Sequence, residues 1–161
     1  MPASASATSA PSRLRGAAAF FFLQALVWVV MTGAVAALID GERDWIANAA
    51  NCAALLFGAL PDLNWAGFYF LRGDQLVLGP FQGKPACVRI PVGKGVCGAA
   101  AAQRRSQLVP DVEAFPGHIA CDSASRSELV VPLIADGALL GVLDLDSPAL
   151  GRSEEHTSEL Q

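Results

Sequence analysis

The chain has 161 residues, of which 53% are hydrophobic, and this fits one domain with a full apolar core and excludes disorder throughout. A formal net charge of -4, with 11 scattered Lys and Arg residues, offers no basic surface and argues against nucleic acid as a partner. Four widely spaced cysteines are too few to form a disulfide framework.

The amino-terminal segment differs in composition from the rest of the chain. Residues 1–12 are mostly Ala, Ser, Pro and Thr, which predicts a disordered leader. Arg13 and Arg15 then precede an apolar stretch from Ala17 to Ile39, a pattern typical of a secretory signal or a membrane span. The alternative is a shifted start of a chain whose domain begins near residue 34. We therefore set residues 1–33 apart and expect the domain at 34–151.

The last ten residues, 152–161, resemble the conceptual translation of a sequencing-adapter oligonucleotide. They are interpreted as a non-biological tail, because such scars carry no information about a fold. His156 belongs to this tail and is not a ligand candidate.

In chain order, an amphipathic helix comes first, with apolar side chains at helical spacing and Pro61 after its end. Two hairpins are predicted, one turning at Arg72-Gly73-Asp74 and one at Asp136-Gly137. The fold class is therefore α+β, with a central antiparallel sheet of about six strands flanked by helices. The helices are expected at 42–60 and 95–104, and the strands at 65–71, 75–81, 87–92, 107–110, 127–134 and 139–146.

Reactive side chains gather between Gly79 and Asp146. Cys97 begins a predicted helix, where the helix dipole is expected to lower the thiol pKa. Cys121 lies in a loop bounded by Pro-Gly and Asp-Ser, and such loops commonly hold sites. His118 either activates Cys121 or makes a structural hydrogen bond, and Cys52 is a small buried hydrophobe. The full set is Cys87, Cys97, His118, Cys121, Asp122, Glu128, Asp144 and Asp146.

A zinc site is an alternative use of Cys87, Cys97, His118 and Cys121. Structural zinc ligands usually come in pairs two to four residues apart, whereas Cys87 and Cys97 are ten residues apart, so this alternative is disfavoured. Gly93-Lys94-Gly95 also lacks the spacing of a phosphate-binding loop. No cofactor is predicted.

Five blocks, in order, resemble the free methionine-(R)-sulfoxide reductases, and the match covers roughly residues 36–148. The resemblance implies a GAF-type fold and a homodimer. It also implies a closing carboxy-terminal helix, and residues 152–161 occupy the position expected for that helix. The blocks are Asn64-Trp65-Ala66-Gly67-Phe68-Tyr69, Leu78-Gly79-Pro80-Phe81-Gln82-Gly83-Lys84-Pro85-Ala86-Cys87, Gly95-Val96-Cys97-Gly98, Phe115-Pro116-Gly117-His118-Ile119-Ala120-Cys121-Asp122-Ser123 and Gly141-Val142-Leu143-Asp144-Leu145-Asp146-Ser147-Pro148.

The resemblance also implies a thiol-dependent reduction of free L-methionine-(R)-sulfoxide. A thiolate attacks sulfur while an acid protonates the oxygen. Cys121 is then the nucleophile and becomes a sulfenic acid, Cys87 closes a disulfide with it, and Cys97 is a reserve partner for disulfide exchange.

Three carboxylates are expected near one pocket in that reaction. Mutual repulsion among Glu128, Asp144 and Asp146 should raise at least one pKa enough to keep a proton, and the others would hold the substrate ammonium. Trp65 and Tyr69, on one side of a strand, either cover the methyl and thioether or form plain core.

Recycling the disulfide calls for a thioredoxin-like reductant, which favours the cytoplasm over export or a membrane anchor. The competing function is a GAF domain that senses a small ligand without turnover. A sensor needs no relay of thiols, so the three ordered cysteines favour the enzyme.

Overall fold

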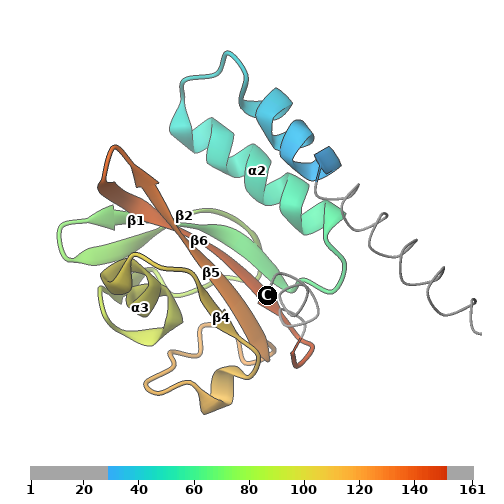
Figure 1. The fold of residues 1–161 in the computed structure, drawn as a ribbon. Helices are drawn as coiled ribbons and strands as arrows, with labels where there is room; N and C mark the ends of the chain where they lie inside the picture. Colours follow the sequence, from blue (N-terminus) through green and yellow to red (C-terminus); the bar gives the residue numbers. More distant parts are fainter. Residues whose placement is uncertain (1–28, 152–161) are drawn as a thin grey trace, which may run out of the picture. The chain divides into compact units, whose positions relative to one another are not determined.

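The computed structural model describes residues 29–151, drawn in colour in Figure 1. The predicted leader, the first part of the apolar stretch and the adapter-like tail lie outside these residues. Residues 29–39 are helical and belong to a separate unit, Met1–Asp40, while the rest forms the unit Gly41–Gln161. Within residues 29–151, no helix combines the length and hydrophobicity required to cross a membrane.

The second unit is built around one antiparallel sheet. Six strands lie in the order β3-β2-β1-β6-β5-β4, and every neighbouring pair is antiparallel. The predicted α+β class and strand count are confirmed. The elements are α2 (Trp45–Ala59), β1 (Trp65–Arg72), β2 (Gln75–Gly83), β3 (Arg89–Pro91), α3 (Gly95–Gln103), β4 (Gln107–Val109), the short 3₁₀ turn η1 (Val112–Ala114), β5 (Ser127–Ala135) and β6 (Ala138–Ser147).

Helix α2 begins at a side-chain cap and packs on one face of the sheet. The Asp44 carboxylate accepts hydrogen bonds from the backbone N–H groups of Ile46 and Ala47, both at 2.9 Å. Ala49 and Ala53 are buried against Phe68 of β1. Only these small residues are fully buried on α2, because the helix lies close to the strands.

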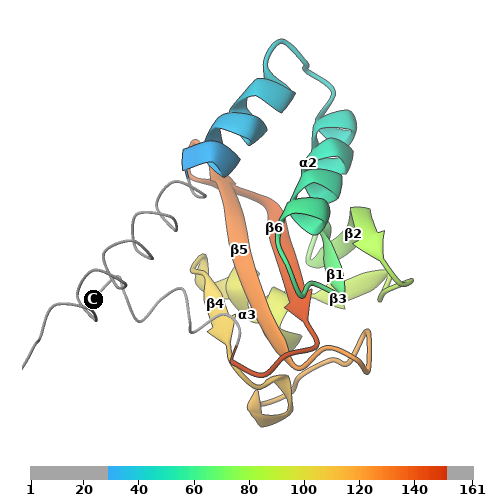
Figure 2. The same cartoon turned by 90° about the vertical axis from the view of Figure 1, so that its right-hand side faces the viewer.

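Strand β1 separates two cores, since alternate side chains of a strand point to opposite faces. Phe68 and Phe70 face α2, whereas Trp65 and Tyr69 join the larger core under α3. Figure 2 shows α2 and α3 on opposite faces of the sheet. The polar site lies on the α3 side.

Helix α3 sits unusually close to the sheet edge at Gly98. A Cβ atom at this position would lie 2.5 Å from the carbonyl oxygen of Pro91, so no larger residue fits without a shift. This contact fixes the first turn of α3, and with it Cys97, above the sheet.

The hairpin of β5 and β6 sets the register of the acidic residues. Asp136 and Gly137 both have positive φ, as a two-residue hairpin turn requires, and Ala135 pairs with Ala138. The turn and a register shift between Leu133 and Ile134 together set the pairing of the two strands, in which Glu128 lies opposite Asp146. The two carboxylates therefore come from adjacent strands on the same face.

Candidate active site

A small cavity of about 30 Å³ lies between α3, the loop that follows η1, and the paired ends of β5 and β6. Its wall combines a thiol, a disulfide sulfur, an imidazole, four carboxyl groups and a few apolar side chains. The lining residues are Ile90, Gly95, Val96, Cys97, His118, Ile119, Cys121, Asp122, Ser125, Glu128, Asp144 and Asp146.

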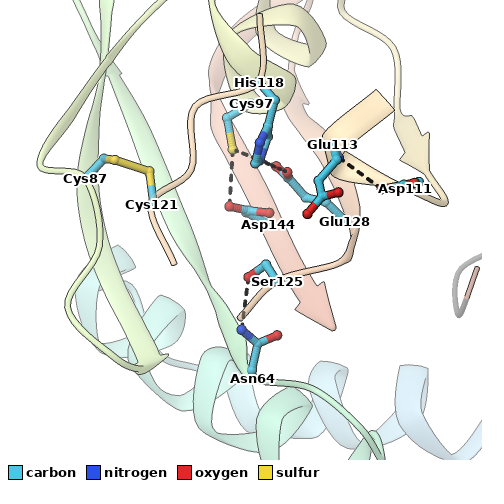
Figure 3. Close-up of polar contacts among 10 residues, drawn as sticks. All are labelled: Asn64, Cys87, Cys97, Asp111, Glu113, His118, Cys121, Ser125, Glu128 and Asp144. Atoms are coloured by element: carbon cyan, nitrogen blue, oxygen red, sulfur yellow. Dashed lines mark hydrogen bonds and ion pairs between the residues drawn. A yellow bond between two sulfur atoms is a disulfide. The ribbon is translucent and has the colours of Figure 1, made fainter. Parts of the chain in front are cut away.

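The centre of this cavity holds a thiol facing two carboxyl groups (Figure 3). The Cys97 thiol donates to Asp144 Oδ2 at 3.3 Å and lies 3.8 Å from Glu128 Oε1. On the far side of Glu128, His118 Nε2 is 3.9 Å from Oε2. Residues from α3, a loop and two strands thus converge on one point, as expected for Cys97, Glu128 and Asp144.

Burial of the acids favours their protonated forms. Burial, helped by the charge of Asp146, raises the pKa of Glu128 to about 8. Burial and the charge of Asp144 raise the pKa of Asp146 to about 9. The pKa of Asp144 is also raised well above its usual range, by burial first and then by Glu128. The direction of these pKa changes is the expected one, but desolvation contributes more to them than the mutual repulsion from which the increase was predicted.

The expectation for Cys97 was wrong. Its position at the start of α3 predicted a lowered thiol pKa, whereas burial and the neighbouring Asp144 and Glu128 raise that pKa well above its ordinary value. The thiol is 3% exposed, so loss of water and nearby acids outweigh the partial charge of a helix end. Cys97 is therefore a protonated hydrogen-bond donor.

A disulfide joins Cys87 to Cys121, the pair implied by the family resemblance. Cys87 lies between β2 and β3, and Cys121 lies in the loop after η1, with Cα atoms 5.3 Å apart (Figure 3). Of the two, Cys121 lines the cavity. The disulfide therefore ties the loop at the cavity wall to the segment between β2 and β3.

In this disulfide form, the disfavoured alternative of a zinc site made of all four ligands is not available. Two of those ligands, Cys87 and Cys121, are bonded to each other. The remaining two, Cys97 and His118, face carboxyl groups.

A hydrogen-bonded group of Asn64, Asp122 and Ser125, here called the latch, holds the same loop. The sequence analysis assigned no role to this group. Asn64 Nδ2 donates to Ser125 Oγ at 2.9 Å and to Asp122 Oδ2 at 3.2 Å. The Ala124 N–H chiefly holds the pKa of Asp122 below its usual range, and Lys84 lies 3.6 Å from this carboxylate. Nothing in the local sequence marks Ser125, because its partner Asn64 lies 61 residues earlier.

Trp65 and Tyr69 lie beneath the acids and not on the cavity wall. Their rings are stacked 5.8 Å apart and are 2% and 1% exposed. Trp65 is paired with Asp146 across the sheet, and burial together with Asp144 raises the pKa of Tyr69. In this disulfide form both side chains belong to the core, which is one of the two roles expected for them.

A six-stranded antiparallel sheet with a helix on either face, holding a cysteine pair beside buried acids, is the arrangement of a GAF domain equipped for thiol redox chemistry. A family model described as GAF domain matches residues 31–161. The free methionine-R-sulfoxide reductase of Escherichia coli (strain K12) is 59% identical over 116 residues, covering 72% of this chain and 70% of that protein.

Two further relatives agree. The free methionine-R-sulfoxide reductase of Saccharomyces cerevisiae is 50% identical over 117 residues, covering 68% of this chain and 65% of that protein. A solved structure of free methionine-R-sulfoxide reductase from Neisseria meningitidis, in complex with its substrate, superposes with a TM-score of 0.74 at 51% identity, covering 80% of this chain and 77% of the other. The chain belongs to the free methionine-R-sulfoxide reductase family.

Proposed function

We propose that this chain reduces the R-sulfoxide of free L-methionine to methionine by thiol chemistry. The observation that carries the proposal is the Cys87–Cys121 disulfide at the wall of a cavity lined by protonated acids. A sulfoxide reductase needs both parts, two thiols that supply electrons and an acid that protonates the departing oxygen.

In the proposed reaction the Cys121 thiolate attacks the sulfoxide sulfur while a carboxylic acid protonates the sulfoxide oxygen. The oxygen then passes from the methionine sulfur to the Cys121 sulfur: the methionine S–O bond and the new Cys121–methionine S–S bond break, an S–O bond to Cys121 forms, methionine leaves, and Cys121 is a sulfenic acid. The Cys87 thiol then attacks Cys121 and releases water, giving the disulfide. The sulfoxide is reduced by two electrons and the thiol pair is oxidised by two.

The buried acids are proposed to serve in proton donation and in substrate binding. Glu128 and Asp146, with pKa values raised to about 8 and about 9, keep protons at neutral pH and are the proposed donors to the sulfoxide oxygen. Asp144 lines the cavity beside Cys97 and is the proposed partner of the substrate ammonium, whose positive charge favours the ionised form of this acid. Trp65 and Tyr69 support this face and can contact the substrate only after the loop moves.

A thioredoxin-like dithiol is the proposed source of electrons for the next cycle. The disulfide must be reduced after each turnover, and such reductants are maintained in the cytoplasm, which is the proposed compartment.

The decisive test measures consumption of each sulfoxide diastereomer of free methionine with a dithiol reductant. Wild-type protein and Cys52→Ser should consume the R form and leave the S form, because Cys52 lies on α2 away from the cavity. Cys121→Ser should lose the activity. Full activity in Cys121→Ser would overturn the nucleophile assignment, and no consumption by wild-type protein would leave the ligand sensor as the better reading.

A further inference from the structure

A second kind of ligand fits the centre of the cavity. Cys97, Glu128 and Asp144 each offer one atom, a sulfur and two carboxylate oxygens, and these three atoms all lie within 4.8 Å of one another. All three side chains are buried. One comes from α3, one from β5 and one from β6, so the sheet and helix hold the three atoms in place.

The separations match those between ligands of one zinc ion. Zinc bonds of about 2.3 Å to sulfur and about 2.0 Å to oxygen at tetrahedral angles put the two ligand atoms roughly 3.5 Å apart. Cys97 Sγ is 3.3 Å from Asp144 Oδ2 and 3.8 Å from Glu128 Oε1. Small adjustments of these side chains would therefore let all three atoms bind one ion.

An unpartnered oxygen independently points to a ligand here. Asp144 is 6% exposed, and its Oδ1 is buried without a hydrogen-bond partner among the described residues. Buried polar atoms are rarely left in this state, because their desolvation is costly. Within residues 29–151, no lysine or arginine forms an ion pair with Asp144 or Glu128. A divalent cation bound between the thiol and the two carboxyl groups would supply the missing partner and displace the protons that these groups otherwise hold.

The geometry points to a Zn²⁺ site formed by Cys97, Glu128 and Asp144, which excludes the sulfoxide substrate while the ion is bound. A thiolate with carboxylates and a nearby imidazole, His118, suits Zn²⁺, whereas Mg²⁺ and Ca²⁺ prefer sites made of oxygen alone. The cavity of about 30 Å³ is large enough for an ion and too small for an amino acid. The disulfide form is thus able to hold the ion.

The binding test uses oxidised protein and Co²⁺ as a spectroscopic substitute for Zn²⁺. With Cys87 and Cys121 joined, Cys97 and Cys52 are the free cysteines. We expect one Co²⁺ per chain, a thiolate-to-cobalt absorption band, and displacement by Zn²⁺ but not by Mg²⁺. Cys97→Ser should lose the band and Cys52→Ser, the matched control, should keep it.

A second variant keeps the test valid if Cys97→Ser does not fold. Asp144→Asn retains the thiol and should weaken Zn²⁺ binding at least about tenfold, with folding checked by circular dichroism. A wild-type protein without the band, a band that persists in Cys97→Ser, or unchanged affinity in Asp144→Asn would each overturn the site.

Inhibition of reduction by Zn²⁺ rests on the proposed function, whereas binding does not. Reductase assays with a reductant that does not bind metal should show competition between Zn²⁺ and sulfoxide. If wild-type protein binds cobalt but does not reduce the sulfoxide, the result counts against the proposed reaction only. If it reduces the sulfoxide but does not bind cobalt, the result counts against the metal site only.

Discussion

The four cysteines have four different surroundings, and these assign them different chemistry. Cys121 lines the cavity in disulfide linkage with Cys87, Cys97 is buried against acids, and burial raises the pKa of Cys52 on α2. A thiol that is to attack must become a thiolate, which the acids around Cys97 oppose. Cys121 is therefore the better candidate for the nucleophile.

At the residue scale, Cys87→Ser should separate the two chemical steps. One equivalent of sulfoxide should still be reduced, because Cys121 remains, but the sulfenic acid should persist because the thiol that forms the observed disulfide is missing. A sulfenic-acid probe followed by mass spectrometry checks this. Labelling at residue 97 in place of residue 121 would contradict the assignment.

The elements hold the site through close backbone contacts as well as side chains. Helix α3 meets β3 at Gly98, where a Cβ would lie 2.5 Å from Pro91 O, and Cys97 is the preceding residue. Gly58 on α2 is the opposite case, with nothing within 4 Å of its virtual Cβ. The same substitution therefore has opposite consequences in the two helices.

At the element scale, Gly98→Ala should lower the free energy of unfolding by about 1–3 kcal/mol, because the added methyl group forces α3 away from the sheet. Gly58→Ala should raise it by up to about 1 kcal/mol through helix propensity. Urea denaturation of both variants measures these changes. A neutral Gly98→Ala would show that the contact tolerates a methyl group.

For the whole molecule, the disulfide makes access to the cavity depend on redox state. A cavity of about 30 Å³ is far below the roughly 300 Å³ or more of small-molecule pockets. Reduction would remove the covalent link at Cys121 from the loop between η1 and β5, whereas the hydrogen bond from Asn64 to Ser125 near the end of this loop does not depend on the disulfide. We therefore expect substrate to enter only after reduction.

The expected outcome is that Cys121→Ser, which cannot form this disulfide or react, binds methionine-(R)-sulfoxide at least about tenfold more tightly than oxidised wild-type protein, about 1.4 kcal/mol. Isothermal titration calorimetry measures both. Equal affinities would mean that the disulfide does not close the site.

Stability of the whole fold should also depend on pH through its buried acids. Several titratable groups face Glu128: Cys97 on α3, His118 in the loop, and Asp144 and Asp146 on β6. Tyr69 of β1 lies beneath these groups. The folded-state pKa values of Glu128 and Asp146, about 8 and about 9, exceed their ordinary values of 4.5 and 3.8. The folded state therefore binds protons more tightly than the unfolded state.

The sign follows directly. This contribution is complete below the ordinary pKa values and is lost as pH rises through about 8 and about 9, so Tm should fall by several degrees between about pH 5 and about pH 9. Thermal unfolding of oxidised protein in a chelator checks the slope, and Glu128→Gln should flatten it. A Tm that rises over this range would contradict the buried-acid account.

The helices, the strands and the two hairpin turns could be predicted from the residues alone, because periodicity and turn residues such as Asp136-Gly137 act over a few neighbouring positions. The ordered motifs of the sequence also identified the family and the cysteine pair. The protonation of Cys97, the latch at Asn64 and the size of the cavity could be established only from the folded chain. Those properties depend on burial by distant segments, as the 31 and 47 residues between Cys97 and its two acids show.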